Sequence, residues 1–183
     1  MKRISRTLLF SALALAMLAV AAPPSGAAGN GKAVERPYKT TGTGTLVVQP
    51  PEECDISAFP IVSCTFETSG TVIGTHVGTA TTASTGVVTL DFAAPCEGRG
   101  GVPGVELRPV SDGEVVAADG SELWTHSEAL GCFVDVDTGF DLVNVGTFVG
   151  GTGRFEGATG TTSIVSSTTD GITVSTTSGT LTY

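Results

Sequence analysis

A single strand-like segment, residues 121–129, holds the side chains best suited to proton transfer at neutral pH. These side chains recur at every second position, so a β-strand would place them on one face. If that face lined a cavity, the indole would stack on a ligand, while the imidazole and a carboxylate would exchange protons with it. The set comprises Glu122, Trp124, His126 and Glu128.

The alternative, which we favour, places this acidic face in water and turns Leu123 and Ala129 inward. Water solvates carboxylates well, whereas burying a carboxylate in an apolar interior without hydrogen-bond partners is unfavourable. His126 and Glu128 therefore stand as catalytic candidates, and Trp124 as a ligand-binding candidate, only if the face is internal.

A glycine-rich segment at residues 150–160, GGTGRFEGATG, has the appearance of a phosphate-binding loop. A P-loop requires a Lys-Ser/Thr pair after the glycines, and this segment has none. A dinucleotide-binding motif requires a third glycine where Glu156 stands, followed by a helix. Glycines at Gly150, Gly151, Gly153, Gly157 and Gly160 instead indicate a sharp structural corner, with Phe155 packed into an apolar site.

The four cysteines predict two disulfides in an exported protein, and four cysteines allow three pairings. We favour Cys54 with Cys64, which bracket a Pro-containing loop, and Cys96 with Cys132. A zinc site is the alternative, but the chain has no C-x-x-C spacing, and we expect no metal.

Residues 1–28 have the pattern of a secretory signal peptide: basic residues, an apolar run over 8–22, then small residues. We expect cleavage after Ala28, with Ala21 as the alternative site. Cleavage would remove three of nine basic residues and none of eighteen acidic ones, which moves the net charge from −9 to −12. Such an acidic chain repels nucleic acid, and we expect a secreted, extracellular protein without a stable membrane anchor.

The remaining sequence is rich in Thr, Ser, Gly and Val and lacks a sustained helical period, which predicts an all-β domain over residues 41–183. Residues 29–40 read as a short flexible leader. About eight antiparallel strands fit a closed barrel or a sandwich, and a barrel leaves no free edge. The expected strands cover 41–48, 64–84 (one long or two short), 87–93, 106–110, 114–118, 121–129, 140–149, 161–169 and 172–183.

Three Asp-Gly pairs predict tight turns between strands, at 112–113, 119–120 and 170–171. In the last strand Ile172 and Val174 differ in parity from Leu181 and Tyr183. That change of face predicts a bulge or bend near Gly179. Within the glycine segment, Arg154 is expected to pair with Glu156 or to cap a turn.

The segment at 149–160 resembles the "GGTG-x-F-x-x-A-x-G" signature of the allene oxide cyclase-like and dirigent-like barrels, and is most similar to that of their secreted bacterial relatives. Residues 116–123, VAADGSEL, resemble a hairpin motif of the same bacterial group, in which Ser121 replaces the usual Asp. The resemblance covers about residues 85–183, and the shared motif is structural.

The resemblance implies an eight-stranded antiparallel closed β-barrel with an apolar lumen, no cofactor, and possible assembly into a trimer. It implies a protein that binds a small apolar ligand and, if it is an enzyme, steers cyclisation or coupling as a cofactor-independent cyclase or isomerase. No catalytic residue of the family aligns with a position here. The alternative is a non-enzymatic exported structural or surface barrel with a filled core.

Overall fold

The computed structural model of the chain describes residues 33–135 and 139–183. The described residues contain eight strands and three single-turn 3₁₀ helices, and none of these helices is long and apolar enough to cross a membrane. The predicted signal peptide and residues 29–32 of the predicted leader lie outside the described residues. The strands are β1 (Glu35–Val48), β2 (Ile61–Gly74), β3 (Gly78–Glu97), β4 (Pro103–Ala117), β5 (Glu122–Phe133), β6 (Phe140–Gly151), β7 (Thr159–Thr169) and β8 (Ile172–Thr182).

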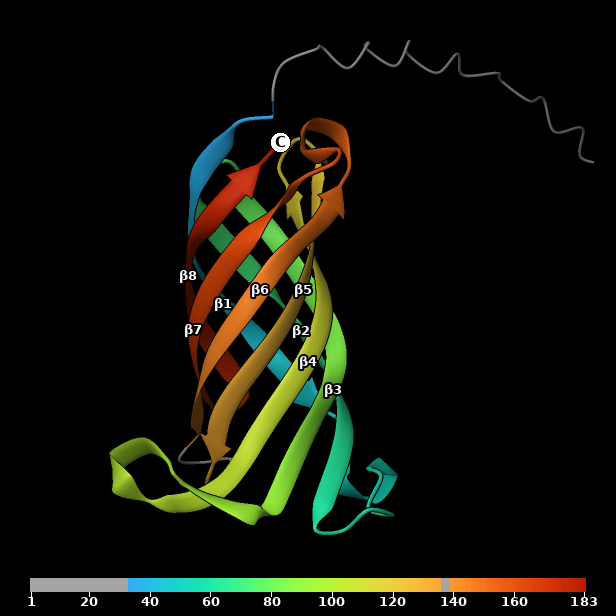
Figure 1. Ribbon diagram of the computed structural model, residues 1–183, viewed down its shortest axis with the longest axis vertical. Helices are drawn as coiled ribbons and strands as arrows, with labels where there is room; N and C mark the ends of the chain where they lie inside the picture. The colour runs from blue at the N-terminus through green and yellow to red at the C-terminus, as the bar shows by residue number, and fades with distance from the viewer. Residues whose placement is uncertain (1–32, 136–138) are drawn as a thin grey trace, which may run out of the picture. The chain divides into compact units, whose positions relative to one another are not determined.

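The strands form a closed antiparallel barrel in which each strand pairs with the next in sequence and β8 pairs with β1 (Figure 1). This up-and-down order confirms the predicted fold class, and closure removes the free sheet edges of the barrel. Within the described strands the register shifts at two places, between Asp91 and Pro95 and between Trp124 and Thr125.

The first strand is longer than predicted. It begins at Glu35, and residues 35–40, which were expected to be part of a flexible leader, pair with β8. Tyr38 within this stretch is only 3 % exposed and packs edge-on against Phe148 at a centroid distance of 4.9 Å. The stretch is held because it closes the barrel and buries an aromatic side chain.

Two of the three predicted Asp-Gly turns are present, at 119–120 and 170–171. Asp170 and Gly171 both have positive φ, 50° and 72°, as a two-residue hairpin requires. The predicted turn at 112–113 is wrong, because β4 runs straight through it. Asp112 and Gly113 pair there with both β3 and β5, and these two ladders hold the dipeptide extended.

The predicted bulge near Gly179 is also wrong, since β8 keeps continuous register with both β7 and β1. Ile172 and Val174 are 51 % and 54 % exposed on the outer face, whereas Leu181 is fully buried inside. The change of parity therefore reflects exposed apolar side chains on a regular strand.

One end of the barrel is closed by a hydrophobic core. We call the end where β1 begins and β8 finishes the closed end (Figure 1). Phe155, in the turn after β6, is fully buried there and meets Tyr183 edge-on at 5.2 Å. The glycine segment is therefore a corner that inserts Phe155 as a plug. The remaining members of this core are Tyr38, Val72, Val77, Ala80, Val115, Ala117, Leu123, Phe148, Ala158 and Leu181.

The backbone of this corner depends on glycine. Gly153 has a φ of 58°, and a Cβ there would lie 2.6 Å from the Ser121 Oγ. The same Ser121 hydroxyl accepts a hydrogen bond from the Arg154 backbone N–H at 3.3 Å. Close approach and positive φ together explain why this position needs glycine.

Candidate functional site: the barrel lumen

The lumen holds a cavity of about 710 Å³ that reaches the end opposite the plug, which we call the mouth. This volume lies within the usual range for small-molecule sites. It is lined mainly by inward-facing residues of all eight strands and by part of the segment between β1 and β2. The same alternation that buries the plug thus leaves the other half of the barrel unfilled.

Apolar side chains surround the mouth. Phe66, Val88 and Leu107 are buried, and the hydrophobic side chains packed against them are only partly buried. Phe133 and Phe140 lie with ring centroids 6.2 Å apart. The partly buried members of this mouth cluster are Leu46, Cys54, Val62, Leu90, Phe133, Phe140 and Leu142.

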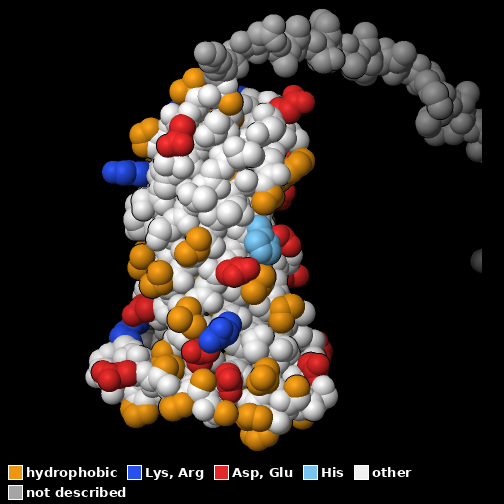
Figure 2. Space-filling view, in the orientation of Figure 1, with side chains coloured by type: hydrophobic (Ala, Val, Ile, Leu, Met, Phe, Trp, Pro, Cys, Tyr) orange, Lys and Arg blue, Asp and Glu red, His pale blue; other side chains and the backbone are white. Residues whose placement is uncertain are grey.

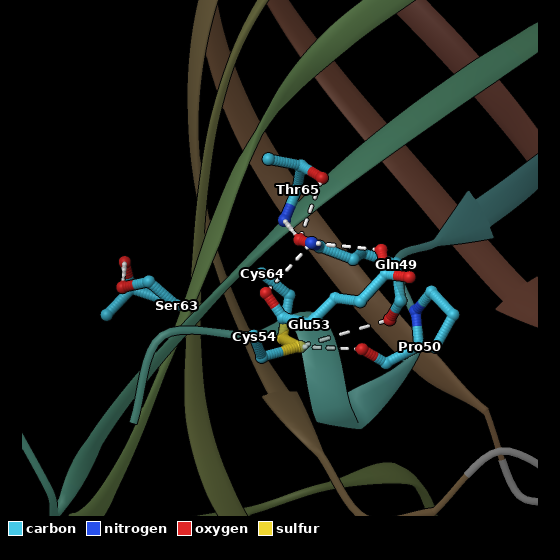
Figure 3. The surroundings of a disulfide bond; sticks show 8 residues. Gln49, Pro50, Glu53, Cys54, Ser63, Cys64 and Thr65 are labelled. Carbon is cyan, nitrogen blue, oxygen red and sulfur yellow. Dashed lines mark hydrogen bonds between the residues drawn. A yellow bond between two sulfur atoms is a disulfide. The ribbon is translucent and has the colours of Figure 1, made fainter. Parts of the chain in front are cut away.

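The segment between β1 and β2 is fastened beside the mouth (Figure 3). A disulfide joins Cys54 to Cys64, which faces the lumen from β2. Gln49 Nε2 donates to the Glu53 carbonyl at 2.8 Å, and Gln49 Oε1 accepts from the Thr65 backbone N–H at 3.1 Å. We call this arrangement the clasp. It holds the segment at the rim of the cavity.

The second predicted disulfide, between Cys96 and Cys132, is also present. Both pairings match the prediction, and the described residues contain no free cysteine. Near this bridge Arg99 reaches the outer face of β6, where it forms an ion pair with Asp141 at 2.6 Å. The hydrogen bond from Arg99 lowers the pKa of Asp141. These contacts fasten the segment between β3 and β4 to the outside of the barrel.

Between the mouth and the closed end, the lumen is lined by hydroxyl groups. Thr68 and Ser84 are hydrogen bonded at 2.7 Å, and Ser111 and Ser127 at 3.0 Å. On β2 to β6 these polar residues separate the apolar mouth cluster from the apolar plug. We call this zone the polar belt: Thr68, Ser84, Ser111, Ser127 and Asn144, continued on β7 and β8 by Thr162, Ser166, Ser175 and Thr177.

Asn144 is the amide of the polar belt. It faces the lumen from β6, between Leu142 toward the mouth and Phe148 toward the plug. Its Oδ1 is buried, and within the described residues it has no hydrogen-bond partner. An unpartnered buried acceptor destabilises a fold by about 1–3 kcal/mol, so it calls for a physical explanation.

The predicted catalytic candidates lie on the outer face of β5, away from the cavity. His126 Nδ1 is 2.7 Å from Asp112 Oδ1, and its Nε2 is 4.0 Å from Glu128 Oε1, with both carboxylate side chains largely exposed. Trp124 is 40 % exposed. Leu123 and Ala129 face inward instead, as the favoured alternative required. His126, Glu128 and Trp124 therefore do not line the cavity in the described structure.

Figure 2 shows the mixture of acidic and hydrophobic side chains on the outer face in view. Arg154 belongs to this outer layer at the closed end; it does not pair with Glu156, the first of its two expected roles, but it reaches the turn at residues 75–77, in keeping with the second. It forms an ion pair with Asp119 and donates to the His76 carbonyl at 2.8 Å. A backbone hydrogen bond from Ser121, with a smaller contribution from Arg154, lowers the pKa of Asp119. These contacts lock the plug from outside.

Burial also perturbs one group at the closed end. Desolvation raises the pKa of Tyr38 to about 12, although a hydrogen bond with Thr40 partly opposes the shift. The phenol therefore stays neutral well above its ordinary pKa of about 10. The shift follows from the burial of Tyr38, whose side chain is only 3 % exposed at this end of the barrel.

Within the described residues, no group of three or more His, Cys, Asp and Glu side chains could hold a metal ion. Comparison of the chain with protein-family models, curated proteins and solved structures gives no match.

Sequence reasoning missed the polar belt and Asn144. A signal was available, because Ser111, Ser127 and Asn144 share the parity of the inward-facing Leu107, Phe133 and Leu142 on their strands. The prediction weighted charged side chains, which β5 carries on the outside, and overlooked neutral polar groups on the inside.

Proposed function

We propose that this chain is a secreted barrel that binds a small apolar molecule in its lumen. The observation that carries the proposal is the cavity of about 710 Å³ behind an apolar mouth. Concave, mostly apolar sites with a few polar groups are typical of small-molecule binding. A structural barrel with a filled core, the alternative considered from sequence, would leave no space of this kind.

The secreted location is part of the proposal. It is supported by the signal-peptide pattern of residues 1–28 and by two disulfides, which persist in oxidising compartments. The resemblance to dirigent-like and allene oxide cyclase-like barrels is likewise proposed, on the glycine segment and the eight-stranded closed barrel.

Any catalysis would proceed by holding a flexible ligand in one reactive shape. The cavity offers aromatic walls, hydroxyls and the amides of Asn144 and Gln49, and orientation alone can contribute several kcal/mol to a rate. We therefore propose ligand binding as the primary function, with steering of cyclisation or coupling as the reaction class if turnover occurs.

Dye binding to the exported protein with its disulfides intact tests this proposal. We expect N-phenyl-1-naphthylamine to fluoresce on entering the lumen. Ala129 faces the cavity, so Ala129→Trp should weaken dye binding at least about tenfold, or 1.4 kcal/mol. The neighbouring Leu130 is 52 % exposed on the outer face, so Leu130→Trp is the matched control.

A second pair of substitutions keeps the test decisive if a variant of the first pair does not fold. Ser175 lines the cavity and Thr176 points outward on the same strand. Ser175→Phe should weaken dye binding, and Thr176→Phe should leave it unchanged. Equal effects of the inward and outward substitutions in both pairs would overturn binding in the lumen.

A further inference from the structure

We propose that the lumen selects a neutral amphiphile that enters with its polar end first. In this arrangement an uncharged head with a hydrogen-bond donor reaches the polar belt at Asn144, while its hydrocarbon tail fills the apolar mouth. The inference rests on the proposed function, and it names the chemical class of the ligand.

The first argument is the order of side chains along the strands. On β4 the inward residues pass from Leu107 at the mouth through Ser111 to Val115 at the closed end. On β6 they pass from Leu142 through Asn144 to Phe148. When a ligand enters at the mouth and places a polar end at the belt, the rest of its length lies among the apolar side chains of the mouth. That remaining length must therefore be apolar. The lumen therefore matches an amphiphile, with its head inward.

The second argument concerns charge. The side chains that line the cavity are aliphatic or aromatic, or carry a hydroxyl group, an amide or the sulfur of a disulfide. Neutral dipoles of this kind replace the hydration of an alcohol or an amide. They replace the hydration of a carboxylate or an ammonium group poorly, and the free energy lost on burying such a charge is large. An uncharged head is thus favoured.

The third argument is the unpartnered oxygen of Asn144. Its Oδ1 can accept two hydrogen bonds, and it receives none from the described residues. Asn144 lines the lumen and the χ2 torsion of asparagine is broad, so rotation of the amide can turn this enclosed oxygen toward the lumen. A ligand O–H or N–H at this position would satisfy it. This favours a head that donates over one that only accepts.

The hydroxyl pairs complete the belt. In each of the pairs Thr68–Ser84 and Ser111–Ser127 one hydroxyl hydrogen is used within the pair. The other hydrogen of each pair remains available, as do several lone pairs. The belt can therefore donate to the oxygen of an alcohol head while Asn144 accepts its hydrogen.

A series of linear probes with alkyl tails of nine or ten carbons and different heads tests the inference. The probes are 1-decanol, which donates and accepts, 1-methoxydecane, which only accepts, and decanoate, which is charged. Each is used to displace N-phenyl-1-naphthylamine from the wild-type protein. We expect 1-decanol to bind at least about tenfold more tightly than either of the others.

The Asn144→Leu variant locates the preference. It should reduce the advantage of 1-decanol over the ether to less than about threefold, because the acceptor is gone. The control Ser163→Leu, on the exposed face of β7, should leave the advantage unchanged. The wild-type series needs no variant, so it remains decisive if Asn144→Leu does not fold.

Equal affinity for the alcohol and the ether, tighter binding of decanoate, or an unchanged preference in Asn144→Leu would each overturn the inference. Failure of the proposed function looks different. In that case the dye itself does not bind, or the inward Ala129→Trp and Ser175→Phe substitutions do not weaken its binding.

Discussion

The closed end and the mouth are built from the same eight strands, yet one is filled and the other is hollow. At the closed end Phe155, Leu123 and Leu181 are fully buried. At the mouth Phe140 and Leu142 are only partly buried and face a cavity. Strand alternation decides which residues face inward. The connecting segments decide whether the inside is filled.

The segments after β6 and after β1 pack differently at their ends of the barrel. The segment after β6 folds over the barrel end and inserts Phe155 into it, with Gly153 permitting the turn. The segment after β1 is fastened at the rim by the Cys54–Cys64 disulfide and by Gln49. The plug therefore fills the closed end of the barrel, and the clasp leaves the mouth open. Substitutions that damage only one end should separate stability from ligand binding.

The largest expected effect is on the plug. Phe155→Ala should lower the free energy of unfolding by about 3–5 kcal/mol, because a fully buried aromatic is lost and leaves a cavity. Phe140→Ala at the mouth should lower it by about 1–2 kcal/mol, since that ring already borders empty space. Urea unfolding followed by circular dichroism measures both. Equal losses would contradict the difference between the two ends.

Loss of a disulfide should come next. For the 10-residue separation of Cys54 and Cys64, replacing both with Ser should lower stability by about 3 kcal/mol in the chain-entropy account. It should also weaken dye binding, because the clasp is released. The same replacement at Cys96 and Cys132 controls for general destabilisation, as that bridge lies outside the lumen. If both double variants weaken the dye equally, the clasp has no special role.

A backbone substitution should have a smaller effect. Gly160 has a φ of 145°, and a Cβ there would overlap the Thr180 carbonyl oxygen. Gly160→Ala should lower the free energy of unfolding by about 2–3 kcal/mol. Gly100 near the mouth also has positive φ, but a Cβ there meets nothing within 4 Å. Gly100→Ala should therefore lower the free energy of unfolding by only about 1 kcal/mol. A larger loss at Gly100 than at Gly160 would contradict the tighter packing of the closed end.

The smallest effect concerns pH. Burial raises the pKa of Tyr38 to about 12 in the folded state, against about 10 when unfolded. Below pH 10 both states hold the proton and stability is unaffected. Between pH 10 and 12 only the folded state holds it, so stability falls by up to about 1.4 kcal/mol per pH unit.

Tyr38→Phe should remove that part of the alkaline decline. The measurement compares urea unfolding of wild type and variant at pH 9 and pH 11. A decline of the same size in both proteins would mean that burial does not raise the pKa of Tyr38.

The sequence predicted the barrel because alternation and turn chemistry are local signals. The turns at 119–120 and 170–171 follow from Asp-Gly alone. The same dipeptide at 112–113 stayed extended, because two neighbouring strands supply ladder partners that no local pattern reveals. Likewise Ile172 and Val174 were expected to mark a buried face, but apolar residues on this strand also face water.

The candidate site was less predictable. Whether a lumen is hollow depends on the summed volume of inward side chains from eight strands, which no single segment encodes. The orphaned oxygen of Asn144 depends on the absence of a partner from neighbouring strands. Conversely, His126 and Glu128 do share one face of β5, as their spacing predicts, but that face is the outer one.

A crystal structure of the protein grown with 1-decanol would show directly whether the lumen binds an amphiphile with its head inward. We expect the alkyl chain among Phe66, Leu90 and Phe140, and the hydroxyl within hydrogen-bond distance of Asn144 Oδ1. The plug at Phe155 should be unmoved. A lumen without density for the alcohol, or an alcohol bound to the outer face beside Trp124, would contradict this binding mode.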